Sequence, residues 1–394
     1  MAKANKHLTH LEDRIIIDGP SGGTEAIKIL HEMGKLLTGK GSGGVVTTKW
    51  DGAPAVVCGV DPADGQFFVG TKSVFAKDAK ICKTPEQIKG WYSGALQEKL
   101  LTSLQYLPQA GITGVLQGDL MFTNDKKKET IQGKRYTTFR PNTITYAAPA
   151  GSDLEKEIEA AKIGIVFHTK YTGNNLSDMR ASFNVGDNDF KTGGDVWAEK
   201  AEFKDVSGVA TFSSGEKSKY DAAVRRAEGS LKKASTMLRK IQSGKKTLAV
   251  DTEFLKFFNN YVKAGRPIPS VDKAFKDFFY HLGGEYSKVI SKNKTLKAQA
   301  NKAGKFIDAV AFLDDNQKEV KMVIAAYMNL QYAKNLLVEK MKKVSQLNLF
   351  VNMGDHYEVT SPEGFVAIVD GEATKLIDRL EFSQLNFTVP KQWD

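Results

Sequence analysis

One lysine stands where the surrounding sequence would let it act as a nucleophile. Lys49 ends a β-rich run and is followed by Trp50-Asp51-Gly52 and then by a second apolar run from Ala55. We expect a strand, a turn that carries the lysine, and a second strand, arranged as a hairpin-like support. A lysine amine is protonated at neutral pH, but burial beside other cations lowers its pKa and makes the free amine available. Asp51 could orient this amine or lie near a metal, and Gly52 allows a close approach of backbone or substrate.

The same four letters also occur in ordinary turns. A K-x-D-G string taken alone favours an exposed lysine beside a turn-forming Asp-Gly pair, because short motifs recur by chance. Residues elsewhere in the chain must therefore decide between a nucleophile and a surface lysine.

Further charged residues lie at the ends or in the middle of expected strands. Lys72 follows the expected strand 66–69, where strands of one sheet can converge on a pocket; the alternative is a loop lysine that faces solvent. Asp119 lies inside the apolar run 115–122, and a carboxylate is costly to bury unless it has partners. Glu363 precedes the apolar run 364–369, and Lys375 lies in a strand-like stretch shortly afterwards.

The remaining expected elements surround these residues. In the expected strand 163–169, Phe167 and His168 alternate, so one of them should face a pocket and the other should face away. Residues 24–37 have helical spacing with Thr24 as a plausible N-cap, after a turn at residues 19–23. Helical patterns also cover 84–108 and 217–349, and strand patterns cover 45–49, 55–60, 143–147 and 357–360.

Length and composition limit the classes of protein. A chain of 394 residues is long enough for two domains, or for one domain with a large insertion. The formal net charge of +10 favours a polyanionic partner, nucleic acid before an acidic membrane surface. Two cysteines without metal spacing indicate a reducing interior. No apolar run reaches membrane-spanning length, and the N-terminus has no signal core.

Two groups of polar residues have open interpretations. Near the N-terminus, His7, His10, Glu12 and Asp13 could border a site, although a polar entry to the first helix is the simpler interpretation. Residues 222–241 carry basic side chains against few acids. Such a cluster could hold a phosphodiester backbone, whereas lysine-rich helix faces are usually only solvated surface. The basic residues in question are Arg225, Arg226, Lys232, Lys233, Arg239 and Lys240.

Taken in order, these motifs resemble those of the covalent nucleotidyltransferase superfamily, the ATP-dependent DNA and RNA ligases and the mRNA capping enzymes. The resemblance covers approximately residues 45–170 and 357–380. In the second half of this ordered set, the most specific match is E-G-F-V at 363–366 followed by Lys375.

The resemblance implies a role for each matching residue. Lys49 would attack the α-phosphate of ATP to form a lysyl-AMP phosphoramidate, Glu363 would engage the catalytic Mg²⁺ (or Mn²⁺), and Lys375 would contact the α-phosphate. Nucleotide contacts are implied for a further set: Thr48, Gly52 beside Asp51 in the turn, Lys72 at phosphate or the 5′-phosphate end, Asp119 at the ribose or the metal, and Phe167 stacked on adenine. Attack on phosphorus needs this combination of a free amine, in-line geometry and positive charge around the developing anion.

Some positions depart from the family pattern. Asp119 stands where glutamate is usual, and Lys72 stands where arginine is common, which removes a bidentate fork. Ile377 stands where ligases often have a second lysine, for which Arg379 could compensate, and Pro54 stands where DNA ligases tend to have arginine. The stretch after Lys375 leaves no room for the OB-fold that DNA ligases and capping enzymes usually carry. RNA ends are therefore favoured over nicked DNA.

The expected fold is α+β: a mainly antiparallel nucleotidyltransferase (ligase adenylation-domain) core from residues 1–215 and 350–394, with an all-helical inserted domain at 216–349 and no C-terminal OB-fold. The expected function is an ATP-dependent polynucleotide ligase that joins 5′-phosphate and 3′-hydroxyl ends, with the helical insertion as a nucleic-acid clamp. We assume a monomer in the cytoplasm, including that of a phage-infected host.

Two other functions are open. One is an adenylyltransferase acting on a protein or a small molecule, against which the basic charge argues weakly. The other is a non-catalytic nucleic-acid-binding protein with the same fold, against which the intact Lys49, Glu363 and Lys375 argue.

Overall fold

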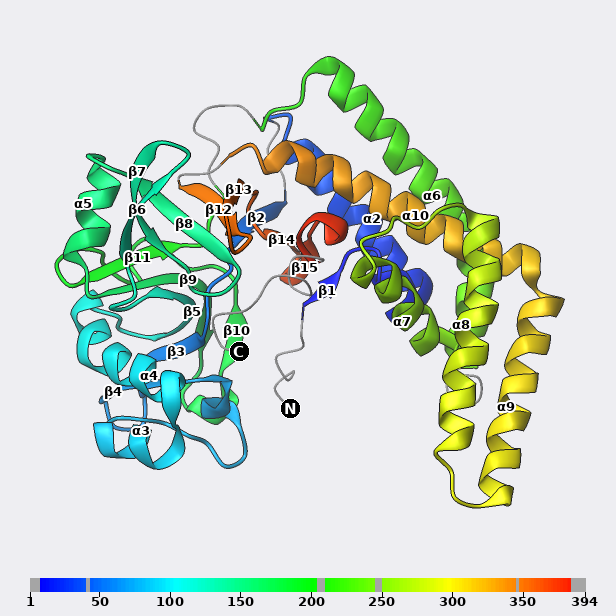
Figure 1. Ribbon diagram of the computed structural model, residues 1–394, viewed down its shortest axis with the longest axis horizontal. Helices are drawn as coiled ribbons and strands as arrows, with labels where there is room; N and C mark the ends of the chain where they lie inside the picture. The colour runs from blue at the N-terminus through cyan, green and yellow to red at the C-terminus, as the bar shows by residue number, and fades with distance from the viewer. Residues whose placement is uncertain (1–7, 40–42, 204–209, 245–249, 345–346, 384–394) are drawn as a thin grey trace.

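The computed structural model describes residues 8–39, 43–203, 210–244, 250–344 and 347–383. Figure 1 shows a β-rich half and a helical half, with a small sheet between them. The protein is α+β and its sheets are mainly antiparallel, which confirms this part of the expected fold. Within the described ranges the strands form three sheets, which we call the lysine sheet, the central sheet and the outer sheet.

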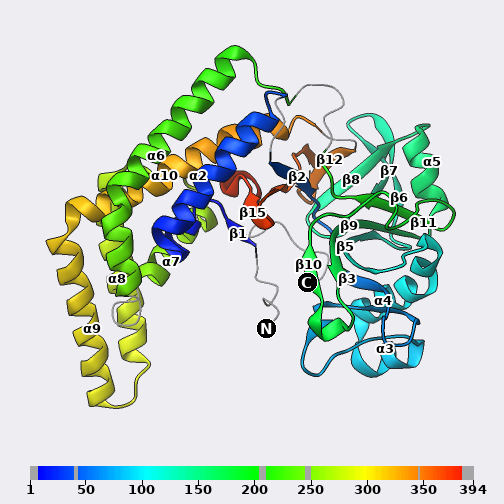
Figure 2. The same ribbon diagram turned by 180° about the vertical axis from the view of Figure 1, so that it is seen from behind.

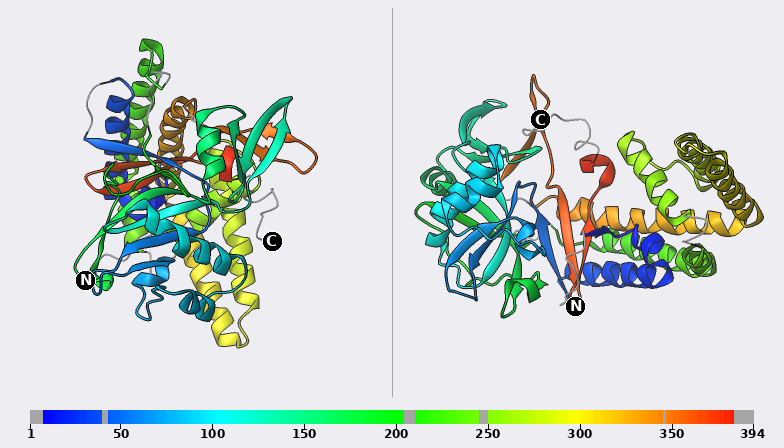
Figure 3. Two further views of the ribbon diagram at one scale, coloured as in Figure 1. Left: turned by 90° about the vertical axis from the view of Figure 1, so that its left-hand side faces the viewer. Right: turned by 90° about the horizontal axis from the view of Figure 1, so that it is seen from below.

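The lysine sheet has the order β1 (Thr9–His10), β15 (Glu372–Leu376), β14 (Gly364–Val369) and β2 (Gly44–Lys49). Strand β1 runs parallel to β15, and the other neighbours are antiparallel. Alternate residues such as Val46 and Phe365 are buried against the helical half. Residues on the opposite face, among them Lys49, look toward the β-rich half, and in Figure 3 the sheet stands between the two halves.

The expected hairpin around Lys49 is wrong. Strand β2 pairs with β14 from the far end of the chain, whereas β3 (Ala55–Val60) belongs to the central sheet. The two strands separate because Val46 joins the core beneath the helices, while Val56 joins the core of the central sheet. Residues 50–54 therefore cross from one sheet to the other.

Residues 50–54 lead into the central sheet. Its order is β10 (Arg180–Ser182), β9 (Ile163–Thr172), β5 (Val115–Phe122), β3 and β4 (Phe67–Gly70), and β11 (Val196–Lys200) pairs in parallel with β9. The expected helix 84–108 is broken into α3 (Pro85–Trp91) and α4 (Gly94–Tyr106), which cover one face of the sheet. Short helical turns come after β4, α4 and β9, at Lys72–Phe75, Leu107–Ala110 and Leu176–Asp178 respectively.

The outer sheet is antiparallel, with the order β13 (Tyr357–Val359), β12 (Asn348–Asn352), β8 (Ile144–Pro149), β7 (Lys134–Phe139) and β6 (Lys127–Ile131). Helix α5 (Asp153–Ala160) packs on β7 and β8. Strand β12 begins at Asn348, inside the range expected to be helical, because Leu349 and Phe350 pack into the β-rich half.

The helical half contains α1 (Arg14–Ile17), α2 (Gly19–Leu36), α6 (Ser214–Ser243), α7 (Val250–Lys263), α8 (Val271–Ser291), α9 (Leu296–Asp315) and α10 (Gln317–Met341). Helices α2, α6 and α10 lie side by side (Figure 2). The chain continues past β15 into a π-helical turn at Arg379–Ser383. Among the helices of the described ranges, none combines the length and the hydropathy that a membrane crossing needs.

Helix α2 begins at Gly19, where a turn was expected. A Cβ at Gly22 would overlap the carbonyl oxygen of Arg14, and a Cβ at Gly23 would overlap the side chain of Leu231 on α6. These glycines therefore serve close packing of α2 against α1 and α6. The N-terminal helix thus shares its core with the segment that was expected to be a separate insertion.

The division into residues 1–215 with 350–394 and residues 216–349 stays a prediction, and its parts at 1–7 and 384–394, including His7, lie outside the described residues.

Candidate active site

Three charged residues from distant parts of the chain meet on the open face of the lysine sheet. Lys49 lies opposite Gly364, and its amine forms an ion pair with Glu363. Lys375 lies opposite Val366, which in turn lies opposite Thr47. Because neighbouring strands are about 4.8 Å apart, the register places both lysines within a few residues of each other across this sheet. Side chains at 49, 363 and 375 therefore converge, as the motif order implied.

The central sheet supplies a further acid. Asp119 on β5 lies against the turn after Lys49, because a Cβ at Gly52 would lie 2.5 Å from the Cβ of Asp119. Asp119 also raises the pKa of Lys49 through its charge. The Lys49 amine therefore lies between carboxylates contributed by two different sheets, and Gly52 is the residue that permits the sheets to approach.

The charge balance around Lys49 differs from the expectation. Burial lowers the pKa of Lys49, but Glu363, Asp119 and Asp51 together raise it more, so the net shift is upward. The prediction that neighbouring cations lower this pKa is wrong here, because the carboxylates outweigh them. Lys49 is consequently held as a cation.

Its two partners are shifted as well. Burial, together with the charges of Asp51 and Asp119, raises the pKa of Glu363 to about 7, although Lys49 opposes the rise. Burial lowers the pKa of Lys375, with Lys49 contributing and Glu363 opposing. Strong shifts of this kind are typical of functional sites, although structural ion networks produce them too.

Asp51 positions the turn. Its Oδ1 accepts a hydrogen bond from Asn142 Nδ2 at 2.8 Å, and its Oδ2 accepts from the backbone N–H groups of Thr143 at 2.7 Å and Ile144 at 2.8 Å. Its own N–H donates to the Tyr146 hydroxyl at 2.7 Å. Both oxygens are thus engaged at the start of β8. Asp51 shapes the turn, as the resemblance implied, and is not placed as a metal ligand or as the group that orients the amine.

Phe167 does not lie in the site. Its side chain is fully buried in the core beneath the central sheet, where it packs against Phe190 with ring centroids 4.9 Å apart. Its neighbour His168 takes the other face of β9, and its Nε2 lies 3.7 Å from Asp119 Oδ1. The alternation was predicted correctly, but the residue that faces the site is His168. Phe167 therefore cannot stack on a base.

A pocket beside Lys49 offers aromatic surface instead. Trp50 and Tyr146 stack there with ring centroids 5.2 Å apart and an interplanar angle of 22°. The pocket is lined by Thr48, Lys49, Trp50, Tyr146, Glu199, Lys200, Glu202, Phe203, Val344, Leu347, Leu349 and Pro362. Apolar walls with a few polar groups are typical of ligand sites. Thr48 lines this pocket, and its aromatic wall is formed by Trp50 and Tyr146, which the sequence did not single out.

Two further residues, Lys72 and His10, lie near Lys375 at the edge of the site. Lys72 is exposed on the turn after β4, and its charge contributes to lowering the pKa of Lys375. His10 lies opposite Lys375 on β1, its Nδ1 is buried, and burial and nearby cations lower its pKa. The sequence had only suggested that His10 could border a site, since its neighbourhood depends on a parallel pairing across the whole chain.

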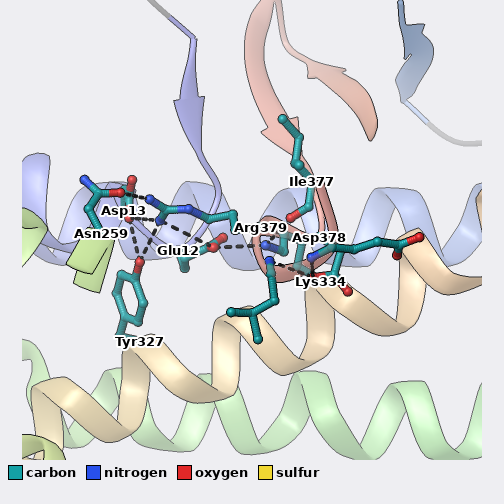
Figure 4. Close-up of polar contacts among 10 residues, drawn as sticks. Glu12, Asp13, Asn259, Tyr327, Lys334, Ile377, Asp378 and Arg379 are labelled. Atoms are coloured by element: carbon teal, nitrogen blue, oxygen red, sulfur yellow. Dashed lines mark hydrogen bonds and ion pairs between the residues drawn. The ribbon is translucent and has the colours of Figure 1, made fainter. Parts of the chain in front are cut away.

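A buried polar network fixes this sheet to the helices (Figure 4). Lys334 on α10 donates to Glu12 Oε1 at 2.9 Å and to the carbonyl of Ile377 at 2.6 Å. Arg379 donates to Asp13 Oδ1 at 3.0 Å and to the Tyr327 hydroxyl at 2.9 Å, and it also bonds to Asn259. Arg379 therefore does not take the place of a second motif lysine, because its guanidinium is committed to the network. Glu12 and Asp13 are likewise structural.

Glu363 and Asp119 provide the hard oxygen ligands that a magnesium ion prefers. Mg²⁺ commonly binds through one or two carboxylates, completed by waters and substrate phosphates. Within the described ranges, the only group of three potential ligands within 4.8 Å of one another is Glu339, Asp378 and Glu381, and two of these, Asp378 and Glu381, line a small pocket together with Glu363. Glu363 and Asp119 do not belong to such a group of described residues, so a metal held by this pair would need further ligands from water or a bound phosphate.

Comparison with known proteins assigns the chain to a family. The family described as "Family of unknown function (DUF6267)" matches residues 5–391, so the chain belongs to it. No curated protein and no solved structure matches the chain.

Proposed function

We propose that this member of the DUF6267 family is an ATP-dependent nucleotidyltransferase that forms a lysyl-AMP adduct at Lys49 and uses it to join polynucleotide ends. The observation that carries the proposal is the convergence of Lys49 with Glu363 and Lys375, which follow it by more than 300 positions in the chain. They fall in the motif order of the covalent nucleotidyltransferases. A chance match of short strings would not bring their side chains to one face of one sheet.

The ion pair supports control over the nucleophile. While Glu363 contacts Lys49, the amine stays protonated and unreactive. A ligand that draws Glu363 away removes the main counter-charge, and burial together with Lys375 then favours the neutral amine. The bond between Lys49 and Glu363 is therefore suited to protect the amine until the nucleotide arrives.

In the proposed first step, ATP transfers its AMP group to Lys49. The Lys49 Nζ lone pair forms a P–N bond to the α-phosphorus of ATP, the bond from that phosphorus to the bridging oxygen breaks, and pyrophosphate leaves. The amine gives up two protons to solvent, one before attack and one after it. Lys375, and Lys72 at the rim, supply positive charge to the phosphates. Trp50 in the adjoining pocket is positioned to stack on the base.

In the later steps, an oxygen of a 5′-phosphate attacks the same phosphorus, the P–N bond breaks, and the Lys49 amine takes up two protons from solvent. A 3′-hydroxyl then attacks the 5′-phosphorus and loses its proton to solvent, the bond from that phosphorus to the bridging oxygen breaks, and AMP leaves. Mg²⁺ held by Glu363 and Asp119 would supply charge neutralisation at the phosphates. The protein's own contribution is to position the amine and to surround the phosphates with lysines.

Adduct formation tests the proposal directly. Incubation with α-labelled ATP and Mg²⁺, followed by denaturing electrophoresis, should give a labelled band that is acid-labile and absent from Lys49→Ala. Lys83→Ala is the matched control. Lys83 is likewise ion-paired and largely buried, bonded to Asp61 and Asp64, but it lies outside the site. This variant should label normally.

The acceptor identifies the reaction. Addition of 5′-phosphorylated RNA should discharge the label as AMP and yield a joined product, with nicked DNA as the competing arm. Discharge only onto a protein or a small molecule would replace the ligase proposal with an adenylyltransferase. Absence of any label with ATP, when the protein is folded, would refute nucleotidyl transfer through Lys49.

A further inference from the structure

The exposed face of α6 has a seven-residue repeat that the proposed active site does not use. Ala222, Gly229, Thr236 and Ser243 are spaced seven residues apart. A basic pair follows each of the first three after three positions: Arg225-Arg226, Lys232-Lys233 and Arg239-Lys240. Seven residues advance a helix by about 10.5 Å and nearly two turns, so each kind of residue forms a row along the helix.

Packing fixes which way these rows face. The residues directly before the pairs, Val224, Leu231 and Leu238, are buried in the core shared with α2 and α10. All six basic residues are exposed. Consecutive residues differ by about 100° around a helix, so the pairs form two rows of cations with the small residues between them. Figures 1 and 2 show α6 along the outer edge of the helical half.

The positive charge of this face is not neutralised within the molecule. Between residues 222 and 243 the only acid in the sequence is Glu228, which bonds to His31 on α2. Arg226 lies over the ring of Tyr332 at 5.5 Å, and Lys240 donates to the Asn316 side chain at 3.3 Å. In the described part of the chain, none of the six cations forms an ion pair with a carboxylate.

We propose that this face of α6 binds the phosphate backbone of a nucleic acid strand, with the strand lying over the small residues between the two rows of cations. Regularly spaced cations match a linear polyanion, and small side chains let it approach the helix closely. A membrane surface fits less well, because an interfacial helix inserts its apolar face and the apolar face of α6 is already buried. The inference builds on the proposed ligase by assigning its substrate a docking surface, but its test does not depend on that activity.

The salt dependence gives the expected magnitude. Each phosphate contact on a single strand contributes about −0.7 to the slope of log K against log salt, so six cations give a slope of about −4. Replacing four of them should reduce the magnitude of the slope by about 3 and weaken binding at low salt by about tenfold or more. Glutamine is a suitable replacement because its helix propensity is close to that of lysine and arginine.

The test compares two variants of the full chain that lose the same charge. One carries K232Q, K233Q, R239Q and K240Q on α6. The control carries K292Q, K294Q, K297Q and K305Q, which are exposed lysines between the C-terminal end of α8 and the middle of α9. Binding of fluorescent, 5′-phosphorylated single-stranded RNA is measured by anisotropy over a range of salt concentrations. We expect the α6 variant to lose affinity and salt dependence and the control to stay close to the wild type.

Three outcomes would overturn the inference: equal losses in both variants, unchanged RNA binding in the α6 variant, or α6-dependent binding of phosphatidylserine vesicles or polyglutamate in preference to RNA. Adduct formation at Lys49 should remain normal in both variants. If no adduct forms in any protein while the α6 variant still loses RNA binding, the proposed ligase fails and the docking surface stands. If the adduct forms normally but RNA binding does not depend on the α6 cations, the docking surface fails and the proposed nucleotidyl transfer stands.

Discussion

Replacing Lys334 by methionine should destabilise the protein strongly, because this lysine and Glu12 form an ion pair with both side chains fully buried. Methionine retains most of the aliphatic length and removes only the charge and the hydrogen bonds. Glu12 Oε1 would lose its partner at 2.9 Å, and Oε2 already has none in the described part of the structure. The carbonyl of Ile377 would lose its donor at 2.6 Å.

Removing one partner of a buried ion pair typically costs about 3–5 kcal/mol, because the other charge stays buried. Arg379 Nη1 lies 3.9 Å from the same oxygen and offsets part of the loss, so we expect about 3 kcal/mol for Lys334→Met. The double variant Glu12→Leu/Lys334→Met removes both charges and should recover most of this loss. The measurement is the urea midpoint and slope, followed by circular dichroism.

Lys340→Met is the matched control. It lies on the same helix and is also ion-paired, but its partner Glu216 is 40% exposed, so solvent screens the pair. The expected cost is below about 1 kcal/mol. If Lys334→Met and Lys340→Met destabilise equally, or if the double variant is as unstable as Lys334→Met, the network is not what holds the lysine sheet to α10.

Three shorter predictions concern the site itself. Glu363 has a folded pKa of about 7, above its ordinary value of 4.5, so its protonated form stabilises the fold and this contribution is lost as pH rises between these values. In urea titrations, the stability of the wild type should therefore fall by up to about 3 kcal/mol more than that of Glu363→Gln between pH 5 and pH 8, while the loss of the Lys49 partner lowers the stability of the variant at every pH. Gly52→Ala places a Cβ 2.5 Å from that of the facing aspartate on β5 and should abolish adduct formation, whereas Gly304→Ala meets nothing within 4 Å and should stabilise by up to about 1 kcal/mol. Trp50→Ala should raise the KM for ATP in the labelling assay, while Phe167→Leu should lower stability and leave that KM unchanged; the opposite pattern would restore Phe167 as the base contact.

Local patterns predicted the strands that carry the site. The runs at 45–49, 55–60 and 115–122 became β2, β3 and β5 because alternating or continuous apolar residues and turn signals act over a few residues. The helical segment expected at 217–349 was predicted for the same reason, although its last residues belong to β12. The ordered motifs also indicated which side chains should meet, and Lys49, Glu363 and Lys375 do meet.

Other features could not be predicted because they depend on contacts between distant segments. The turn prediction for Gly22 and Gly23 failed because these positions need glycine for close packing, since a Cβ there would overlap Arg14 or Leu231. The hairpin prediction failed because strand partners are chosen by the core that each strand joins. Propensity and periodicity carry no information about either choice.

The sequence by itself determined the elements, the basic charge and the order of the reactive side chains, since these follow from local spacing and composition. Only the tertiary structure decided that Lys49 is held as a cation, that His168 and not Phe167 faces the site, and that Trp50 and Tyr146 line the pocket. The physical reason is that pKa shifts and facing side chains arise from burial and from charges a few ångströms away, and those neighbours come from elements that are tens to hundreds of residues apart in the chain.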